Sequence, residues 1–305
     1  MTEAVGRQAA LIERFWWFTF WSTAAVFVLV MVALAWAVWH RRDGIERTDR
    51  TLGRGVIVAV VATAGYLFVY LVLDLVTGRA LVGMERENAL SIRVTGHQWW
   101  WEIEYEDSLP SRRLLTANEL HIPVGRPVRI ELASTDVIHS LWMPRLHGKR
   151  DLVPGRTNEI WIRADSAGVW EGQCAEFCGH QHANMRLVVV AEESARFQRW
   201  YDAQLQPALP PATVLAGEGL HVFLTRQCVM CHAVRGTQAG GRVAPDLTHI
   251  ASRLTIAAGT LPNTRGHMAG WIVDPQRIKP GVRMPPNPMT PGEQQALLAY
   301  LEGLR

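Results

Sequence analysis

The feature of this sequence that most constrains its fold is the segment 15–39, a run of 25 residues without a charged side chain. As a helix it would span about 38 Å, enough to cross a hydrocarbon core of roughly 30 Å with some tilt. A secretory signal peptide is the alternative, because Ala35-Trp36-Ala37 resembles a cleavage site. The run is too long for a signal peptide and is followed at once by Arg41 and Arg42. We therefore expect a transmembrane helix.

A second apolar run covers residues 55–73 and predicts a return helix over about 55–76. The loop between the two helices contains five arginines and the segment before the first helix contains two, so the positive-inside rule places the loop in the cytoplasm. Residues 1–89 are therefore expected to anchor the chain in a membrane, with the N-terminus and all later residues on the external side. The loop arginines are Arg41, Arg42, Arg47, Arg50 and Arg54, and the other two are Arg7 and Arg14.

Composition limits what the rest of the chain can be. The chain has 305 residues, of which 49% are hydrophobic and 19% charged, so we expect about two further domains and exclude disorder. The formal net charge of +3 excludes a strongly basic nucleic-acid-binding protein. Membrane lipid is an expected partner and nucleic acid is not.

Residues 90–205 have the pattern of a β-sandwich. Apolar and polar side chains alternate in short segments such as 128–132 and 159–162, and turn residues separate these segments. A short helix over 196–205 is expected to close the domain.

The Pro/Ala-rich segment 206–216 predicts a semi-rigid linker and a domain boundary. In the remaining domain, 217–305, helical patterns at 219–226 and 293–304 enclose a Gly/Pro-rich middle. Basic and acidic residues number 12 and 14 over 96–200, and 9 and 5 over 217–305, giving net charges of −2 and +4. The two domains are therefore expected to attract each other weakly.

The four cysteines form two tight pairs, a layout poorly suited to disulfides that close long loops. Cys174, Cys178, His182 and Met185 lie within 12 residues, and soft sulfur ligands with imidazole select copper, zinc or iron–sulfur. The thioether favours copper over zinc. Two thiolates suggest bridges between two copper ions, each completed by a histidine and a weaker ligand. A Cys174–Cys178 disulfide is the alternative, but it leaves His182 and Met185 unexplained.

A second histidine ligand must come from another part of the chain. We select His139, because it lies at the end of a predicted strand where a loop can deliver it. Four other histidines are rivals, and we expect each to be an ordinary solvated or hydrogen-bonded loop residue. They are His97, His121, His147 and His180.

Four segments together resemble subunit II of cytochrome c oxidase, a likeness that extends over roughly 15–190. They are Gly96–Tyr105 with its three tryptophans, the His139 segment, Val153–Arg156 and the Cys174–Met185 motif. The resemblance implies a cupredoxin-like Greek-key sandwich behind a two-helix transmembrane hairpin.

Carried over to this sequence, the resemblance implies a dinuclear copper centre and a magnesium site. Cys174 and Cys178 would bridge the copper ions, and the backbone carbonyl of Glu176 would be one of the ligands. The Glu176 carboxylate would face magnesium at the boundary with subunit I. Trp99 matches the family's exposed tryptophan where electrons enter, although a covalently attached donor can change its use. The remaining copper ligands would be His139, His182 and Met185.

Cys228-Val-Met-Cys231-His232 is a C-x-x-C-H motif, the signature of covalent haem c attachment. A thioredoxin-like site would require a βαβ pattern, which is absent, and zinc would require two more ligands. The all-α pattern of 217–305 resembles a class I cytochrome c. For the second axial ligand we choose Met284, in a proline-bounded loop, ahead of Met289 and Met268. Met230 lies between the two cysteines, and we expect it to be a packing residue and not an axial ligand.

Two one-electron carriers on one anchored chain predict a relay. The resemblance implies that electrons pass from an external cytochrome c or other donor through haem c and copper to the haem of subunit I. Oxygen reduction and proton translocation would belong to subunit I, with subunit III as a further partner. Glu46 corresponds loosely to a carboxylate near a proton inlet, and we expect it to be a solvated loop acid instead. A nitrous-oxide-reducing enzyme and a copper-handling membrane protein are the alternatives.

Overall fold

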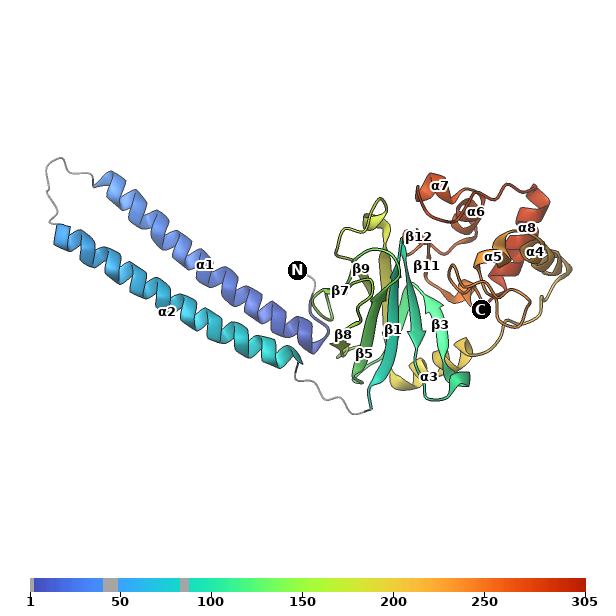
Figure 1. Ribbon diagram of the computed structural model, residues 1–305, viewed down its shortest axis with the longest axis horizontal. Coiled ribbons are helices and arrows are strands. Elements are labelled where there is room, and N and C mark those ends of the chain that lie inside the picture. The colour runs from blue at the N-terminus through green and yellow to red at the C-terminus, as the bar shows by residue number, and fades with distance from the viewer. Residues whose placement is uncertain (1–2, 41–48, 83–87) are drawn as a thin grey trace. The chain divides into compact units, whose positions relative to one another are not determined.

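The computed structural model describes residues 3–40, 49–82 and 88–305 (Figure 1). It divides into two compact units, one formed by Gln8–Glu85 and the other by Met1–Arg7 with Arg86–Arg305. Each unit is described by itself. Glu46 and the loop arginines Arg41, Arg42 and Arg47 lie outside the described residues.

The first unit is a pair of long apolar helices, α1 (Arg7–Trp39) and α2 (Asp49–Val82). Both are long and apolar enough to cross a membrane, and both extend beyond the ranges predicted from the sequence. Two hydrogen bonds join hydroxyl groups of the helices, Thr19 with Tyr70 at 3.1 Å and Ser22 with Tyr66 at 2.9 Å. In an apolar surrounding, such pairs satisfy polar groups that would otherwise be costly to bury.

The second unit begins with a sandwich of two five-stranded sheets (Figure 1). The pairs β1–β5 and β4–β10 are parallel and the other pairs are antiparallel, so strands distant in sequence lie side by side in both sheets. This topology is the predicted cupredoxin-like Greek-key sandwich. One sheet has the order β3 (Leu114–Ala117), β2 (Trp100–Tyr105), β1 (Leu90–His97), β5 (Val128–Ser134), β8 (Asn158–Ile162). The other has β4 (Glu119–Pro123), β10 (Arg186–Glu192), β9 (Gly168–Cys174), β6 (His139–Trp142), β7 (Arg150–Leu152).

Alternation along the strands builds the core of the sandwich. In β1, Leu90, Ile92 and Val94 are buried while the residues between them are partly exposed. Trp101 and Tyr105 of β2 are fully buried in the same core. The helix α3 (Ser194–Gln204) closes the sandwich, close to its predicted range.

The C-terminal part is helical, as expected for a cytochrome c domain. The first and last helices pack so closely that a Cβ added to Gly219 would overlap the carbonyl oxygen of Ala296, so only glycine fits this crossing. The last helix begins with a capping box between Thr290 and Glu293. The helices are α4 (Val214–Thr225), α5 (Cys228–Cys231), α6 (Arg265–Val273), α7 (Pro275–Ile278) and α8 (Pro291–Glu302), with a small hairpin of β11 (Thr255–Ile256) and β12 (Leu261–Pro262).

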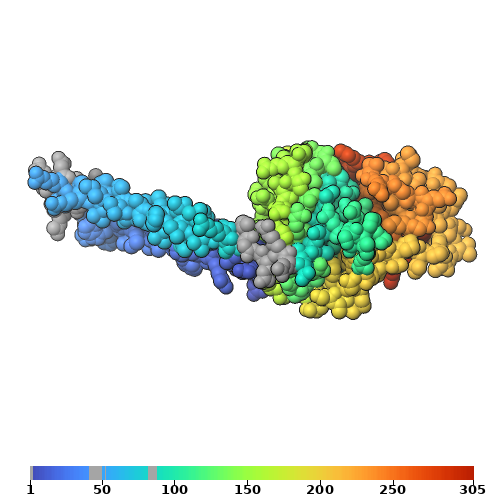
Figure 2. Space-filling model, turned by 60° about the horizontal axis from the view of Figure 1, so that its bottom comes forward, coloured from blue at the N-terminus to red at the C-terminus, as the bar shows by residue number. Residues whose placement is uncertain are grey.

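The segment expected to be a linker is not a free spacer. Gln206 accepts a hydrogen bond from His249 at 3.0 Å, and the amide of Ala208 donates to the carbonyl of Arg235 at 2.9 Å. The first helix of the domain starts at Val214, inside the predicted linker, with Thr213 as its N-cap. Figure 2 shows the surfaces of the sandwich (green) and the helical domain (orange) in contact.

Candidate metal centres

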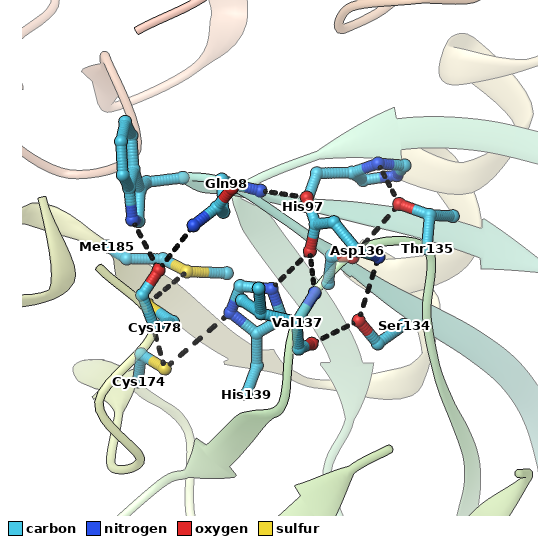
Figure 3. A network of polar contacts seen from close by, with 12 residues as sticks. His97, Gln98, Ser134, Thr135, Asp136, Val137, His139, Cys174, Cys178 and Met185 are labelled. Atoms are coloured by element: carbon cyan, nitrogen blue, oxygen red, sulfur yellow. Dashed lines mark hydrogen bonds and ion pairs between the residues drawn. The ribbon is translucent and has the colours of Figure 1, made fainter. Parts of the chain in front are cut away.

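The structure brings the predicted sulfur and imidazole groups together at one end of the sandwich (Figure 3). The Sγ atoms of Cys174 and Cys178 lie 3.8 Å apart, and Nδ1 of His139 lies 3.9 Å from the Cys174 sulfur. On the other side of the pair, the Cys178 sulfur is 3.6 Å from Nδ1 of His182 and 3.9 Å from the Met185 sulfur. These side chains come from the ends of β9 and β6, the loop after β9, the short 3-10 helix His182–Asn184 and the residue before β10.

The two thiols are electrostatically unequal. The hydrogen bond from Cys178 is the main cause that lowers the pKa of Cys174 to about 3, with further donation from His139 and backbone amides against the opposing effect of burial. The hydrogen bond to Cys174, together with burial, raises the pKa of Cys178. The pair therefore shares one proton. Cations that replace this proton gain two adjacent thiolates, the donor set that copper prefers.

Asp136 orients His139, a role that the sequence analysis missed. The Nε2 of His139 donates a hydrogen bond to a carboxylate oxygen of Asp136 at 2.9 Å, so Nδ1 faces the sulfur atoms (Figure 3). The other carboxylate oxygen accepts from the backbone N–H of Gln98 at 2.7 Å. Burial opposes ionisation of Asp136, but these hydrogen bonds outweigh it and lower its pKa. The spacing of three residues between Asp136 and His139 was the available signal.

Gly96 leaves room for the His139 ring. A Cβ at Gly96 would lie 2.7 Å from Cδ2 of His139, which is too close for a carbon–carbon contact. A side chain at this position of β1 would displace the imidazole. The imidazole is fully buried, with no exposed surface.

The backbone carbonyl and the side-chain carboxylate of Glu176 have different surroundings. Its backbone carbonyl oxygen lies 3.2 Å from the Cys174 sulfur, beside the cluster. Its carboxylate lies 3.7 Å from the ammonium of Lys149 and is partly exposed. The carbonyl therefore lies beside the sulfur atoms and the carboxylate is accessible from outside the cluster, and metal binding by Glu176 stays a prediction.

The four rival histidines lie elsewhere and have other partners or face solvent. His97 stacks on Trp100 and bonds to Thr135, and His147 contacts the carbonyl of Gly148. His121 lies between Glu119 and Glu192, and His180 is exposed.

Trp99 is buried, unlike the exposed tryptophan that the resemblance implies. Only 9% of it is accessible, and its indole Nε1 donates a hydrogen bond of 3.0 Å to the carbonyl of Cys178. A Cβ added to Gly281 of the helical domain would lie 3.6 Å from the indole ring, so this domain covers the tryptophan.

The C-x-x-C-H motif forms a separate site. Cys228 and Cys231 are free thiols at the two ends of the single turn α5, and His232 follows directly. Nδ1 of His232 lies 2.7 Å from the carbonyl oxygen of Pro245, a partner that only an N–H can satisfy. Nε2 is then left as the free lone pair that an axial haem ligand needs. Burial lowers the pKa of His232, which favours this neutral, ligating form.

The segment 241–244 packs closely on the backbone of the motif. A Cβ at Gly241 would lie 2.5 Å from the backbone of Cys231, so glycine allows the segment before Val243 to pack directly on the motif. The amides of Val243 and Ala244 both donate to the Cys231 carbonyl. Met230, which we expected to pack, is 72% exposed.

The candidate axial methionines differ in position. Met268 is buried on α6 in the core of the domain, and Met289 packs against that core. Met284 is half-buried on the loop after α7, where its carbonyl accepts a hydrogen bond from Gln276 at 2.8 Å. Met284 stays our prediction for the second axial ligand, because it lies in the proline-bounded loop.

Two membrane-length helices, a cupredoxin-like sandwich with a buried Cys/His/Met cluster and a C-x-x-C-H helical domain define a class of membrane-anchored redox proteins. Residues 110–192 match the family "Cytochrome C oxidase subunit II, periplasmic domain", and residues 216–305 match "Cytochrome c". The chain belongs to the cytochrome c oxidase subunit 2 family.

Two curated relatives illustrate the match. Cytochrome c oxidase subunit 2 of Alkalihalophilus pseudofirmus is 40% identical over 220 residues, covering 72% of this chain and 62% of that protein. The Arabidopsis thaliana protein of the same name is 30% identical over 209 residues, covering 59% of this chain and 80% of that protein. The chain thus spans less than two thirds of the first relative's length.

A solved structure is also similar to part of this chain. The crystal structure of the periplasmic domain of subunit II of cytochrome oxidase of Bradyrhizobium japonicum is 31% identical in sequence, with a TM-score of 0.37. The match covers 40% of this chain and 96% of the chain in that structure.

Proposed function

We propose that this chain is the subunit of a respiratory cytochrome c oxidase that receives electrons on the periplasmic side of a bacterial inner membrane. An external donor such as a cytochrome c delivers electrons to the haem c domain. From there they pass to a dinuclear copper centre and on to the haem of subunit I. Dioxygen is reduced to water in subunit I, coupled to proton translocation, and subunit III is a further partner.

The observation that carries this proposal is the cluster around the 3.8 Å contact between Cys174 and Cys178. In the proposal these two residues bridge a pair of copper ions. When bound, copper and haem c each supply reversible one-electron chemistry. The protein contributes a dry, rigid surrounding in which the ligands need little rearrangement. The other ligands are His139, His182, Met185 and the carbonyl oxygen of Glu176.

In the helical domain the chain's own residues hold haem c. Cys228 and Cys231 would attach it covalently, and Nε2 of His232 would be a ligand to its iron. Met284 would be the second ligand, and a methionine ligand raises the reduction potential into the range that suits an oxidase.

Magnesium is proposed at the Glu176 carboxylate, at the boundary with subunit I. This is supported by the outward position of the carboxylate while its carbonyl faces the sulfur atoms. Carboxylate oxygen is a preferred ligand for this hard cation. Lys149 would then have to move away.

Metal and haem analysis of the intact, purified membrane complex tests the function. We expect two copper ions and one covalent haem c per chain, and oxygen uptake with reduced cytochrome c. Replacing Cys178 by serine should remove the copper and leave the haem, whereas replacing Cys228 and Cys231 by alanine should do the reverse. One labile copper without haem would instead indicate a copper-handling protein and overturn the proposal.

A further inference from the structure

Lys279 is a buried lysine whose hydrogen-bond partners lie in both domains of the external part. Its side chain is 1% exposed, and its Nζ lies 2.9 Å from the carbonyl oxygen of Trp99 and 2.6 Å from that of Asn184. The third acceptor, at 3.0 Å, is the carbonyl of Ala257 in its own domain. Among the described residues, the hydrogen bonds of its Nζ all go to these three carbonyl oxygens. Three acceptors match the three N–H groups of an ammonium, which offsets the cost of burying it.

The acceptors lie beside the copper-binding segments. Trp99 precedes β2 and bonds through its indole to the Cys178 carbonyl, and Asn184 is the residue before Met185. Further contacts join the same segments, since Gln181 donates to the carbonyl of Pro280 at 2.8 Å. Lys279 therefore lies within the contact between the domains, beside the copper-binding segments.

The turn between β11 and β12 also takes part in the contact between the domains. Ala257, Ala258 and Gly259 all have positive φ, at 53°, 56° and 73°, a conformation that is costly for the two alanines. The carbonyl of Ala258 accepts a hydrogen bond from the amide of Arg186 at 3.0 Å. A Cβ at Gly259 would lie 2.7 Å from Cβ of Arg186. The shape of this turn thus fits the segment that follows Met185.

We propose that Lys279 is a positioning residue that fixes the cytochrome c domain on the copper-binding segments. The docked domain places the loop from Lys279 to Met284 against Trp99, with Gly281 over the indole ring. The indole in turn contacts the carbonyl of a copper-bridging cysteine, so the contacts are continuous from the haem domain to the copper ligands. The consequence for electron transfer rests on the proposed function, whereas the docking itself does not.

Replacement of Lys279 by methionine in the intact oxidase tests the proposal. Methionine keeps an unbranched stem and removes all three donors. The matched control is Arg277→Met, which removes an exposed positive charge two residues away on α7. We expect hydrogen exchange of the Arg186 amide and of residues 255–261 to accelerate in Lys279→Met and to stay unchanged in Arg277→Met. Haem c and copper contents should equal those of the wild type.

Transient kinetics give the second readout. Transfer from haem c to copper should slow about tenfold in Lys279→Met and become sensitive to salt, because a loosely tethered donor must find its orientation. If Lys279→Met loses its cofactors, Gly259→Ala serves instead, since its Cβ would press on Arg186 without touching Lys279 or a ligand. Wild-type exchange and wild-type transfer rates in these variants would overturn the proposal. Absence of any haem-to-copper transfer in the wild type would overturn the proposed relay, while the exchange result still decides whether Lys279 fixes the domain.

Discussion

The indole N–H of Trp99 donates a hydrogen bond to the backbone carbonyl of Cys178, and the cytochrome domain covers the other side of the ring. The same carbonyl accepts a second bond from the side chain of Gln98 at 2.7 Å. The tryptophan that the resemblance places at the surface is therefore enclosed between a proposed copper ligand and the attached domain. In the proposed relay, external donors would therefore approach the helical domain instead.

A variant without haem tests this consequence. Replacing Cys228 and Cys231 by alanine should leave copper bound but make its reduction by external cytochrome c at least about tenfold slower, because the covered Trp99 offers no docking surface. Stopped-flow absorbance of the copper centre measures the rate. A small chemical reductant should still reduce the copper, which controls for an intact centre. Reduction by cytochrome c at the wild-type rate would show that Trp99 is accessible.

The carboxylate of Asp136 should tune copper binding. Asp136→Asn weakens the acceptor for Nε2–H of His139, and loss of such an orienting partner typically costs about 10–100-fold in metal affinity. Copper content after dialysis against a graded chelator measures this. Asp165→Asn is the control, since Asp165 is exposed and pairs only with Arg163 at 3.3 Å among the described residues. Equal copper retention in both variants would contradict the orienting role.

Two glycines of α4 should respond in opposite ways to alanine. Gly219→Ala would drive a Cβ into the backbone of Ala296 and separate α4 from α8, at a cost of about 1–3 kcal/mol or more. Gly217 has open space around its Cα, so Gly217→Ala should stabilise the helix by about 0.5–1 kcal/mol. Thermal unfolding of the haem domain, followed by haem absorbance, compares them. Equal midpoints for the two variants would exclude the close crossing.

His121 makes the stability of the sandwich depend on pH. Burial alone would lower its pKa, but hydrogen bonds with Glu119 and Glu192 outweigh burial and raise it above the usual 6.5. Arg196 also pairs with Glu192, and the Tyr105 hydroxyl contacts the backbone of His121. Because the folded pKa is the higher one, this stabilisation is complete below about pH 6.5 and is lost as the pH rises through the folded pKa.

His121→Phe tests the pH dependence. Phenylalanine can keep the stacking on Trp200, where the ring centroids now lie 3.9 Å apart, and it has no proton to lose. The wild type should lose stability as the pH rises from about 6.5 through the raised pKa of His121, and this loss should be absent in the variant. Unfolding midpoints at a series of pH values measure it. Parallel pH profiles for the two proteins would rule His121 out as the cause.

The sequence predicted the site residues that lie within one short segment better than it predicted contacts between distant segments. The segment from Cys174 to Met185 carries its donors within one loop, so their spacing alone indicated a soft-metal cluster. His139 was found because a strand pattern ends there. Asp136 was missed although it lies only three residues away, because an aspartate in a turn is usually explained by its own backbone hydrogen bonds.

Contacts between distant segments had no such signal. The three acceptors of Lys279 come from separate parts of the chain, and each is a backbone carbonyl, which every residue type has. The burial of Trp99 depends on the same contact between domains. The parallel pairing of β1 with β5 was also hidden, since alternation shows which face of a strand is buried and not which strand is its neighbour.

The burial of Trp99 affects which surfaces of such a chain can evolve separately. Met230, inside the C-x-x-C-H motif, and Val243, which follows it, are both exposed on the helical domain. Neither residue belongs to the Cys/His/Met cluster of the sandwich. In the proposed relay, substitutions at this exposed surface would change the choice of partner and leave the copper ligands in place, so the two properties could evolve independently on one polypeptide.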